Sequence, residues 1–237
     1  MISKELLQKE ADKINVSLDE TALERFDRYA ELLVDWNKKI NLTAITDPEG
    51  ILYKHFIDSL VILKYIDIPK ESKIIDVGTG AGFPGVALLI ARPDLKLTLL
   101  DSTKKKLTVI SDILENLNLS AEILHMRAED AGKSPDYRET FDYATARAVT
   151  NLRDLAEICI PFVKEGGFFI PLKGAGAEEE INSAKKSITT MGGKITNVDS
   201  FSLNLCGERA LITIKKINST PSKYPRPSAQ IAKKPII

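Results

Sequence analysis

A short apolar run that ends in closely spaced glycines constrains this chain more than any other feature. The run is Lys73–Val77, and the sequence continues Gly78-Thr-Gly-Ala-Gly-Phe-Pro-Gly85. A strand that leads through a glycine-rich turn into a helix brings backbone N–H groups and the positive end of the helix dipole against a ligand. Glycine is required there because a Cβ would block close approach or forbid a positive φ. The pattern predicts a ligand site at the end of a first strand.

The glycine turn alone does not identify the ligand. Gly80-Ala-Gly-Phe-Pro-Gly85 satisfies the dinucleotide pattern GxGxxG, and Asp101 follows Gly80 by 21 residues. A nicotinamide cofactor and another adenosine-bearing cofactor therefore both fit. No Gly-Lys-Ser/Thr follows, so the turn is not a phosphate-binding loop of the P-loop class. A tight turn without any ligand is the remaining interpretation.

The chain after the turn alternates between strands and helices, which predicts an α/β fold. Units of this length imply a doubly wound, mostly parallel sheet with helices on both faces. A final antiparallel pair brings the sheet to seven strands. The predicted strands are 73–77, 95–100, 121–126, 141–146, 167–172, 194–201 and 209–217, and the predicted helices between them are 84–91, 103–117 and 151–163.

The chain divides into three predicted parts. Residues 1–69 form a helical N-terminal cap, because apolar residues recur at spacings of three and four after Ser17–Asp19 and again after Asp47–Pro48. Residues 70–217 form the cofactor-binding domain. Residues 218–237 form an irregular, basic C-terminal arm.

Charge is distributed unevenly although the whole chain has 33 basic and 33 acidic residues. From Arg209 to the end there are seven basic residues and no acidic residue. Residues 1–208 therefore carry a net charge of −7. A basic tail on an acidic body indicates a polyanionic partner or a solubilising, frayed terminus.

Composition excludes several classes of protein. Cys159 and Cys206 have no CxxC partner and only His55 and His125 are available as histidine ligands, so neither a disulfide framework nor a metal site is expected. No apolar run is long enough for a membrane span, and the N-terminus has no apolar signal core. We expect a cytoplasmic protein without a membrane partner.

Acidic residues near the strand ends favour a cofactor that carries an amino acid and a positive charge. Asp76, inside the end of the first strand, must either order the loop or face a cationic ligand, because a buried carboxylate is otherwise destabilising. Asp101 can accept both ribose hydroxyls or cap the next helix. Ala128 and Glu129 follow the third strand, where an adenine edge would lie, and Phe83 can wall that pocket or belong to the core.

These residues resemble a known family. The spacing of Asp76–Gly85, Asp101, Ala128–Glu129 and Thr145-Ala-Arg-Ala-Val149 resembles class I S-adenosylmethionine-dependent methyltransferases, whose fold is Rossmann-like. More narrowly, it resembles the bacterial 16S rRNA guanine-N7 methyltransferase G family, also called glucose-inhibited division protein B. Further matches cover nearly the whole chain; they lie at Trp36-Asn37, 41–43, 55–60, 171–174 and 223–226. One departure is 227–232, where the family has a more basic, glycine-containing stretch.

The resemblance implies a cofactor, a reaction and a set of contacts. The cofactor is S-adenosylmethionine, and the reaction is methyl transfer to N7 of a guanine in 16S rRNA of the small subunit. The protein is expected to be a monomer. The implied cofactor contacts are Gly78, Phe83, Asp101, Ser102, Thr103, Ala128, Glu129 and Arg147, with Asp76, Gly80 and Gly82 as secondary candidates.

Guanine N7 has a lone pair and no hydrogen, so its methylation needs positioning and no base. We accordingly predict no catalytic acid or base. Arg147, at the end of the fourth strand, is expected to order the pocket through Asp76 or a phosphate, or to form a plain salt bridge. His55 and Asp58 share one helical face and either meet the nucleotide or lock the cap to the core.

Basic residues near the predicted site are candidates for phosphate contacts to RNA. They are Arg147, Lys173, Arg226, Lys233 and Lys234. Lys104–Lys106 more often belong to a solvated helix face.

Two rival functions remain. A small NAD(P)-dependent oxidoreductase uses the same glycine turn, but the chain has no YxxxK pair and few histidines. A non-catalytic RNA-binding protein that retains the cofactor fold is the other; it would bind the demethylated cofactor and transfer no methyl group.

Overall fold

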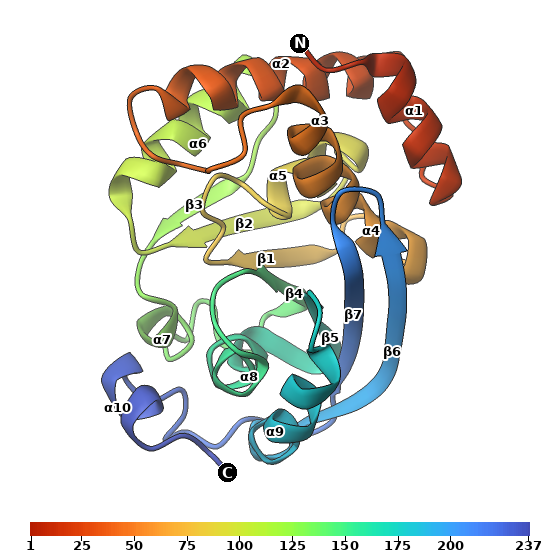
Figure 1. Ribbon diagram of the computed structural model, residues 1–237. Helices are drawn as coiled ribbons and strands as arrows, with labels where there is room; N and C mark the ends of the chain where they lie inside the picture. The colour runs from red at the N-terminus through yellow and green to blue at the C-terminus, as the bar shows by residue number, and fades with distance from the viewer.

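The computed structural model describes residues 1–237, and a seven-stranded sheet forms its centre (Figure 1). The strands are β1 Lys73–Val77, β2 Lys96–Asp101, β3 Glu122–His125, β4 Phe141–Arg147, β5 Val163–Lys173, β6 Gly193–Leu203 and β7 Gly207–Lys216. Their order is β3-β2-β1-β4-β5-β7-β6. The pairs from β3 to β5 are parallel, and β7 is antiparallel to both β5 and β6. The predicted doubly wound, mostly parallel sheet of seven strands is confirmed.

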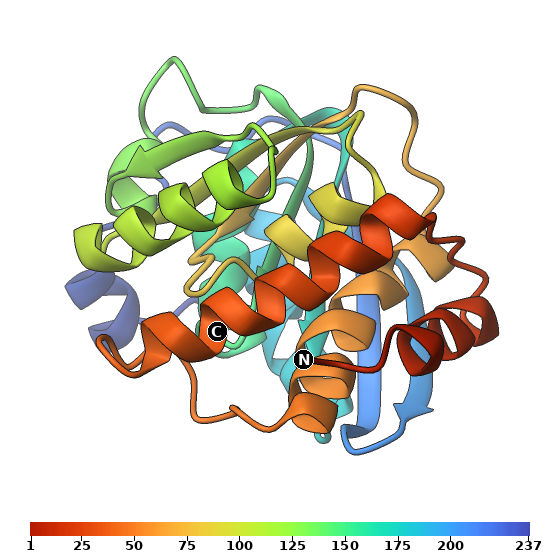
Figure 2. The same ribbon diagram turned by 90° about the horizontal axis from the view of Figure 1, so that it is seen from above.

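Helices cover both faces of the sheet, as Figure 1 shows. They are α1 Lys4–Lys13, α2 Glu20–Asn37, α3 Pro48–Gly50, α4 Asp58–Tyr65, α5 Gly85–Ala91, α6 Lys104–Asn116, α7 Ala128–Ala131, α8 Leu152–Cys159, α9 Ala177–Thr190 and α10 Ser228–Lys233. A π-helical segment, η1 Ile51–Ile57, joins α3 to α4, and a 3₁₀ turn, η2 Ile160–Phe162, follows α8. Helix α2 lies against α5 and α6 on one face (Figure 2). Helices α8 and α9 pack together on the other.

Alternation along the strands divides the core into two clusters. In β1, Ile74 packs with the cluster that holds α2, α4 and α5, whereas Ile75 and Val77 pack with the cluster that holds α8 and α9. Successive side chains of a strand point to opposite faces, so a strand covered on both faces is apolar throughout. The short apolar runs in the sequence have this origin.

The N-terminal helices share one hydrophobic cluster with the sheet. Leu7 of α1, Phe26 of α2 and Phe56 of η1 are fully buried in the same cluster as Leu97 of β2. The cap is therefore packed onto the central sheet and has no separate core. The three-part division at residues 69 and 217 stays a prediction.

The structure corrects two helix predictions. The helix expected over 151–163 ends at Cys159, because Pro161 follows in a 3₁₀ turn and β5 already begins at Val163. Helix α9 has no counterpart among the predicted elements. Its sequence is rich in charged and small residues, and only Ala184, Ser187 and Ile188 are buried.

The C-terminal arm is mostly irregular in secondary structure, as expected, but it folds back onto the body. It contains α10, and Tyr224 and Ile231 are buried. Arg138 donates hydrogen bonds to the carbonyl oxygens of Thr220 and Tyr224 at 2.6 and 2.8 Å. Local sequence does not reveal these contacts, since they join residues more than 80 positions apart.

No helix of the structure combines the length and the apolar character that crossing a membrane requires.

Candidate active site

The glycine turn joins β1 to α5 as a tight loop that is tied to β2. The N–H groups of Gly78 and Thr79 donate to the carbonyl oxygen of Leu100 at 2.8 and 3.0 Å. Gly82 has φ +100°, and a Cβ there would lie 2.5 Å from the hydroxyl oxygen of Tyr29. Glycine is therefore required at this position for both conformation and space.

Asp76 orders this loop. Its Oδ2 accepts hydrogen bonds from the Thr79 hydroxyl at 2.7 Å and from the Gly85 N–H at 2.9 Å, at the start of α5. Burial raises the pKa of the Asp76 carboxyl to about 6. Its Oδ1 is the one buried side-chain oxygen or nitrogen in the chain without a hydrogen-bond partner. Asp76 was expected either to order the loop or to face a cationic ligand. Its two hydrogen bonds order the loop.

Asp101 lies at the end of β2 and faces the loop. Its Oδ2 accepts from the Gly80 N–H at 3.0 Å and its Oδ1 from the Thr103 N–H at 2.8 Å. The carboxylate thus fixes both the glycine turn and the first turn of α6. Each oxygen keeps a second lone pair that can accept a further hydrogen bond.

A cavity of about 320 Å³ opens beside Asp101. This volume falls within the ~300–1,000 Å³ range of small-molecule sites. Six of the eight predicted cofactor contacts line it: Gly78, Asp101, Ser102, Thr103, Ala128 and Glu129. The structure thus brings together residues from the ends of β1, β2 and β3, and we call this space the Asp101 cavity.

Sequence reasoning missed the apolar walls of the Asp101 cavity. Met126, Val149 and Ile158 line it, as does Lys106 of α6. Met126 immediately follows β3, a position that the strand pattern could have indicated. Ile158 comes from α8 across the sheet, and no local pattern assigns it. The sequence favours a solvated helix face for Lys106, whereas the structure places this residue in the lining of the cavity.

Phe83 is not among the residues that line the Asp101 cavity. Its ring is stacked between His55, with ring centroids 4.5 Å apart, and Tyr29, at 5.1 Å. The Arg147 guanidinium lies over the same ring at 5.1 Å. The side chain is buried in the core and joins the cap to the glycine turn. Of the two positions expected for Phe83, the structure therefore shows the one in the core.

Arg147 is held by the cap and does not contact Asp76, the partner suggested by the sequence. It donates to Asp58 Oδ2 and to the carbonyl oxygen of Lys54, both at 2.9 Å. Asp58 also accepts from Nε of Arg209 at 2.9 Å. The buried Asp58 carboxylate therefore connects the ends of β4 and β7 to the cap, a contact that locks the cap to the core.

His55 is neutral in this arrangement. Burial, together with the charge of Arg147, lowers the pKa of the imidazole to about 3. Its Nδ1 lies 3.2 Å from an Arg147 nitrogen that can only donate, so Nδ1 is the acceptor. The proton then resides on Nε2, which is 3.0 Å from the hydroxyl of Thr43 and donates to it.

A second cavity of about 380 Å³ lies beside Arg147, and we call it the Arg147 cavity. Ala148 lines both the Asp101 cavity and the Arg147 cavity. It has φ +55°, so the chain turns sharply after β4. Arg147 consequently lines one cavity and Val149 the other. Ala148 is the one residue that the two linings share.

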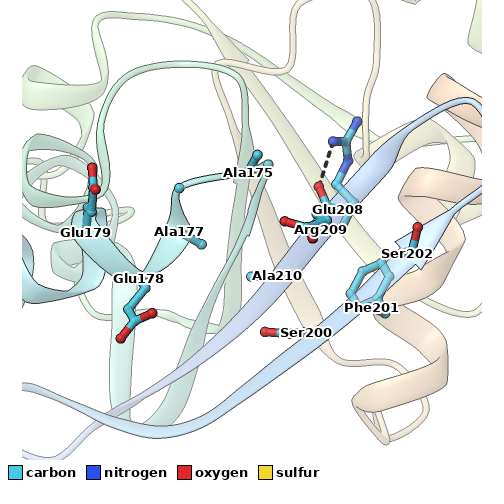
Figure 3. A pocket seen from close by; sticks show the side chains of 12 residues that line it. Ala175, Ala177, Glu178, Glu179, Ser200, Phe201, Ser202, Glu208, Arg209 and Ala210 are labelled. Atoms are coloured by element: carbon cyan, nitrogen blue, oxygen red, sulfur yellow. Dashed lines mark hydrogen bonds between the residues drawn. The ribbon is translucent and has the colours of Figure 1, made fainter.

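A third cavity, of about 530 Å³, lies between the start of α9 and strands β6 and β7 (Figure 3). Glu178, Glu179 and Glu208 line it (Figure 3). Gly174 and Arg209 line both this cavity and the Arg147 cavity. It contains no predicted cofactor contact. Its excess of carboxylates disfavours a polyanionic ligand.

Two RNA candidates are paired within the fold. Lys173 Nζ lies 2.7 Å from Glu180 and donates to the carbonyl oxygen of Thr150 at 2.9 Å. The Arg226 guanidinium binds the buried carboxylate of Glu157. Lys233 and Lys234, by contrast, are exposed and their ammonium groups have no partner in the structure.

No group of three or more His, Cys, Asp or Glu side chains is placed so that it could hold a metal ion.

Comparison with known proteins identifies close relatives over almost the whole chain. A ribosomal RNA small subunit methyltransferase G from Clostridium novyi is 44% identical over 98% of this chain and 97% of its own length. Proteins of the same name from Desulforamulus reducens and Bacillus subtilis are 42% and 44% identical, over 97% and 93% of this chain and the same shares of their own lengths.

Solved structures confirm the class I methyltransferase fold. TrmN from Thermus thermophilus has a TM-score of 0.54 at 14% identity and covers 70% of this chain and 53% of its own. A SAM-dependent O-methyltransferase from Thermotoga maritima has a TM-score of 0.50 at 14% identity, and the match covers 80% of this chain and 72% of that chain.

The family described as "GidB: rRNA small subunit methyltransferase G" matches residues 22–212. The chain therefore belongs to the rRNA small subunit methyltransferase G family.

Proposed function

We propose that this protein transfers a methyl group from S-adenosylmethionine to N7 of a specific guanine in 16S rRNA of the small ribosomal subunit. The observation that carries the proposal is that the Asp101 cavity and the Arg147 cavity are neighbours whose linings share Ala148. A methyltransferase needs a donor site and an acceptor site in direct contact. Family membership supports the choice of reaction and of RNA.

The residues of the Asp101 cavity fit S-adenosylmethionine. The Asp101 carboxylate has lone pairs available for ribose hydroxyls, and Met126 and Ile158 provide apolar walls for an adenine ring. We propose Ala128 and Glu129 at the adenine edge, and Gly78, Ser102 and Thr103 as further contacts. Asp76, Gly80 and Gly82 then act indirectly, by holding the loop. Arg147 acts from the Arg147 cavity, and Phe83, which lines neither cavity, acts through its contacts with His55 and the Arg147 guanidinium.

The chemistry places few demands on the side chains. When bound, S-adenosylmethionine supplies an electrophilic methyl group on a sulfonium sulfur. In methyl transfer the N7 lone pair would form the new N–C bond while the S–C bond breaks, so that S-adenosylhomocysteine would leave and the guanine would carry the positive charge. No proton moves, so no general base is required. The protein's part is to hold the two partners in line and to keep water out.

RNA binding is proposed for the exposed basic groups near the site and on the arm. Lys233 and Lys234 are available for phosphates, whereas Lys173 and Arg226 first satisfy Glu180 and Glu157. We propose that these two residues support the RNA surface through their ion pairs. A monomeric state and a cytoplasmic location complete the proposal.

Methyl transfer from labelled S-adenosylmethionine to unmodified small subunits and to their bare RNA tests this function. Chemical cleavage at N7-methylguanine should then locate the label at a single guanine. Label without cleavage would retain the methyltransferase and reject N7 as the acceptor. Cofactor binding without any label would favour a non-catalytic RNA-binding protein, and hydride transfer to a nicotinamide would favour the oxidoreductase.

A further inference from the structure

Some polar side-chain atoms that line the Arg147 cavity are hydrogen-bonded within the fold, and others are not. Both oxygens of Asp58 are used, one by Arg147 and one by Arg209. Glu180 Oε2 accepts from the Leu152 N–H at 2.6 Å and pairs with Lys173. No hydrogen bond engages Glu180 Oε1, and neither a hydrogen bond nor an ion pair engages the ammonium group of Lys54. One donor and one acceptor in the lining therefore remain available to a ligand.

These two groups approach the cavity from opposite faces of the sheet. Lys54 belongs to η1 of the cap, and Glu180 to α9, which packs beside α8. The carboxyl ends of β4 and β5 lie between them and provide Ala148 and Leu172. A flat ligand inserted between the cap and α9 would present one edge to an ammonium group and another edge to a carboxylate.

The cavity lining is positive overall. Lys54, Arg147, Lys173 and Arg209 outnumber Asp58 and Glu180, and His55 is neutral. This balance contrasts with the acidic cavity next to it (Figure 3). A nucleotide with its phosphate is attracted to such a lining.

Guanine matches the two free groups. O6 is an acceptor adjacent to N7, and the opposite edge presents the donors N1–H and N2–H₂. The free oxygen Glu180 Oε1 has two lone pairs and can accept from both of these neighbouring donors, and an ammonium can donate to O6. Adenine would place an amino donor against the ammonium and would leave the carboxylate without a donor from N1. Unpaired buried groups of this kind disfavour the wrong base.

We infer that the Arg147 cavity receives the target guanine, with Lys54 donating to O6 and Glu180 accepting from the N1–H and N2–H₂ edge. The inference rests on the proposed function and names the residues that select its substrate base. N7 then faces Ala148 and the donor site. Asp58 is a positioning residue that holds the two arginines, and its paired carboxylate lies near the positive charge that methylation creates.

Two variants test the inference, and of the two only Glu180→Gln alters a contact of the fold, because it removes the charge that pairs with Lys173. Lys54→Ala removes an ammonium that has no partner, and Glu180→Gln keeps the size of the side chain. The matched controls are Lys64→Ala, near the end of the same helical segment, and Glu179→Gln, which lines the acidic cavity. Each variant is compared with the full-length protein in kcat and KM for small subunits, in Kd for S-adenosylhomocysteine and in Tm.

We expect kcat/KM for RNA to fall about tenfold or more in Lys54→Ala and Glu180→Gln, as is typical when a hydrogen bond to a charged group is lost. The Kd for S-adenosylhomocysteine should stay within about twofold, because neither residue lines the Asp101 cavity. Both controls should behave like the original protein. Variants that match their controls would overturn the inference while the proposed function stands. A protein that methylates no subunit RNA would overturn both.

Inosine provides a readout that a merely structural role would not change. It keeps O6, N1–H and N7 but lacks the 2-amino group that Glu180 is proposed to bind. Subunits reconstituted with inosine at the methylated position should react more slowly with the original protein. Glu180→Gln should lose that preference for guanine. A variant that is slow but still prefers guanine as strongly as the original protein would show that Glu180 only supports the fold.

Discussion

Glu157 of α8 and Arg226 of the C-terminal segment form a buried ion pair with three hydrogen bonds. Arg226 donates from Nε at 2.8 Å, from its guanidinium nitrogen at 2.7 Å and from its backbone N–H at 2.9 Å. Glu157 is 1% exposed. The next residue, Ile158, lines the Asp101 cavity. The C-terminal segment is thereby attached to the helix that forms one wall of the cofactor site.

Removing Arg226 should therefore affect stability before RNA binding. Arg226→Ala leaves the Glu157 carboxylate buried without its partner, and breaking a buried pair in this way lowers the free energy of unfolding by about 3–5 kcal/mol. Chemical denaturation measures the loss, and Lys233→Ala, with its exposed ammonium, is the control. Equal stability of the two variants would mean that the ion pair does not hold the segment.

Asp101→Ala should weaken binding of S-adenosylhomocysteine by at least ~1–2 kcal/mol, because hydrogen bonds to a charged group are lost. The carboxylate also holds the Gly80 and Thr103 N–H groups, so the turn itself is expected to loosen. Calorimetry gives the dissociation constant. Asp130→Ala, whose side chain is not part of the cavity lining, is the control. An unchanged dissociation constant for Asp101→Ala would contradict the assignment.

The two tail lysines should contribute to RNA binding through charge alone. Lys233→Gln combined with Lys234→Gln is expected to reduce the slope of log affinity against log salt by about 1–2, since each phosphate contact releases a counterion. Cofactor affinity should not change. The measurement is RNA binding over a series of salt concentrations. If the slope were the same in the variant, the arm would make no phosphate contact.

His55 should make the protein less stable in acid. Its folded pKa of about 3 lies below the ordinary value of 6.5, so the unfolded chain binds a proton that the folded chain does not between these values. The free energy of unfolding should therefore fall as the pH drops from about 6.5 towards 3. His55→Gln, which has no titrating group, should show a weaker fall over the same interval. The two pH profiles, measured by denaturation, would be parallel if His55 were already protonated in the fold.

The sequence predicted the features that depend on local pattern. Glycines after an apolar run indicated the loop, and Asp101 and Ala128–Glu129 were found because each directly follows a strand. The carboxyl ends of parallel strands meet at one edge, so position along the chain translated directly into position in the cavity.

Features that depend on contacts between distant elements were not predictable in this way. Arg147 is bound by Asp58, 89 residues earlier, and Asp58 in turn binds Arg209, 151 residues later. Helix α9 carries its apolar residues Ile181, Ala184 and Ile188 on one side, but nothing in its local sequence shows that it would place Glu180 beside Lys173. The packing of the arm on the body was not predictable, because it depends on hydrogen bonds with the distant residues Arg138, Glu139 and Glu157.

Ala148 contributes only a methyl group to the linings of the Asp101 cavity and the Arg147 cavity. Its left-handed backbone is less favourable for alanine than for glycine, by roughly 1 kcal/mol. A longer side chain at this position would take volume from both spaces at once. Under the proposed function, a larger side chain at position 148 is therefore expected to reduce the room for the donor and for the acceptor nucleotide together.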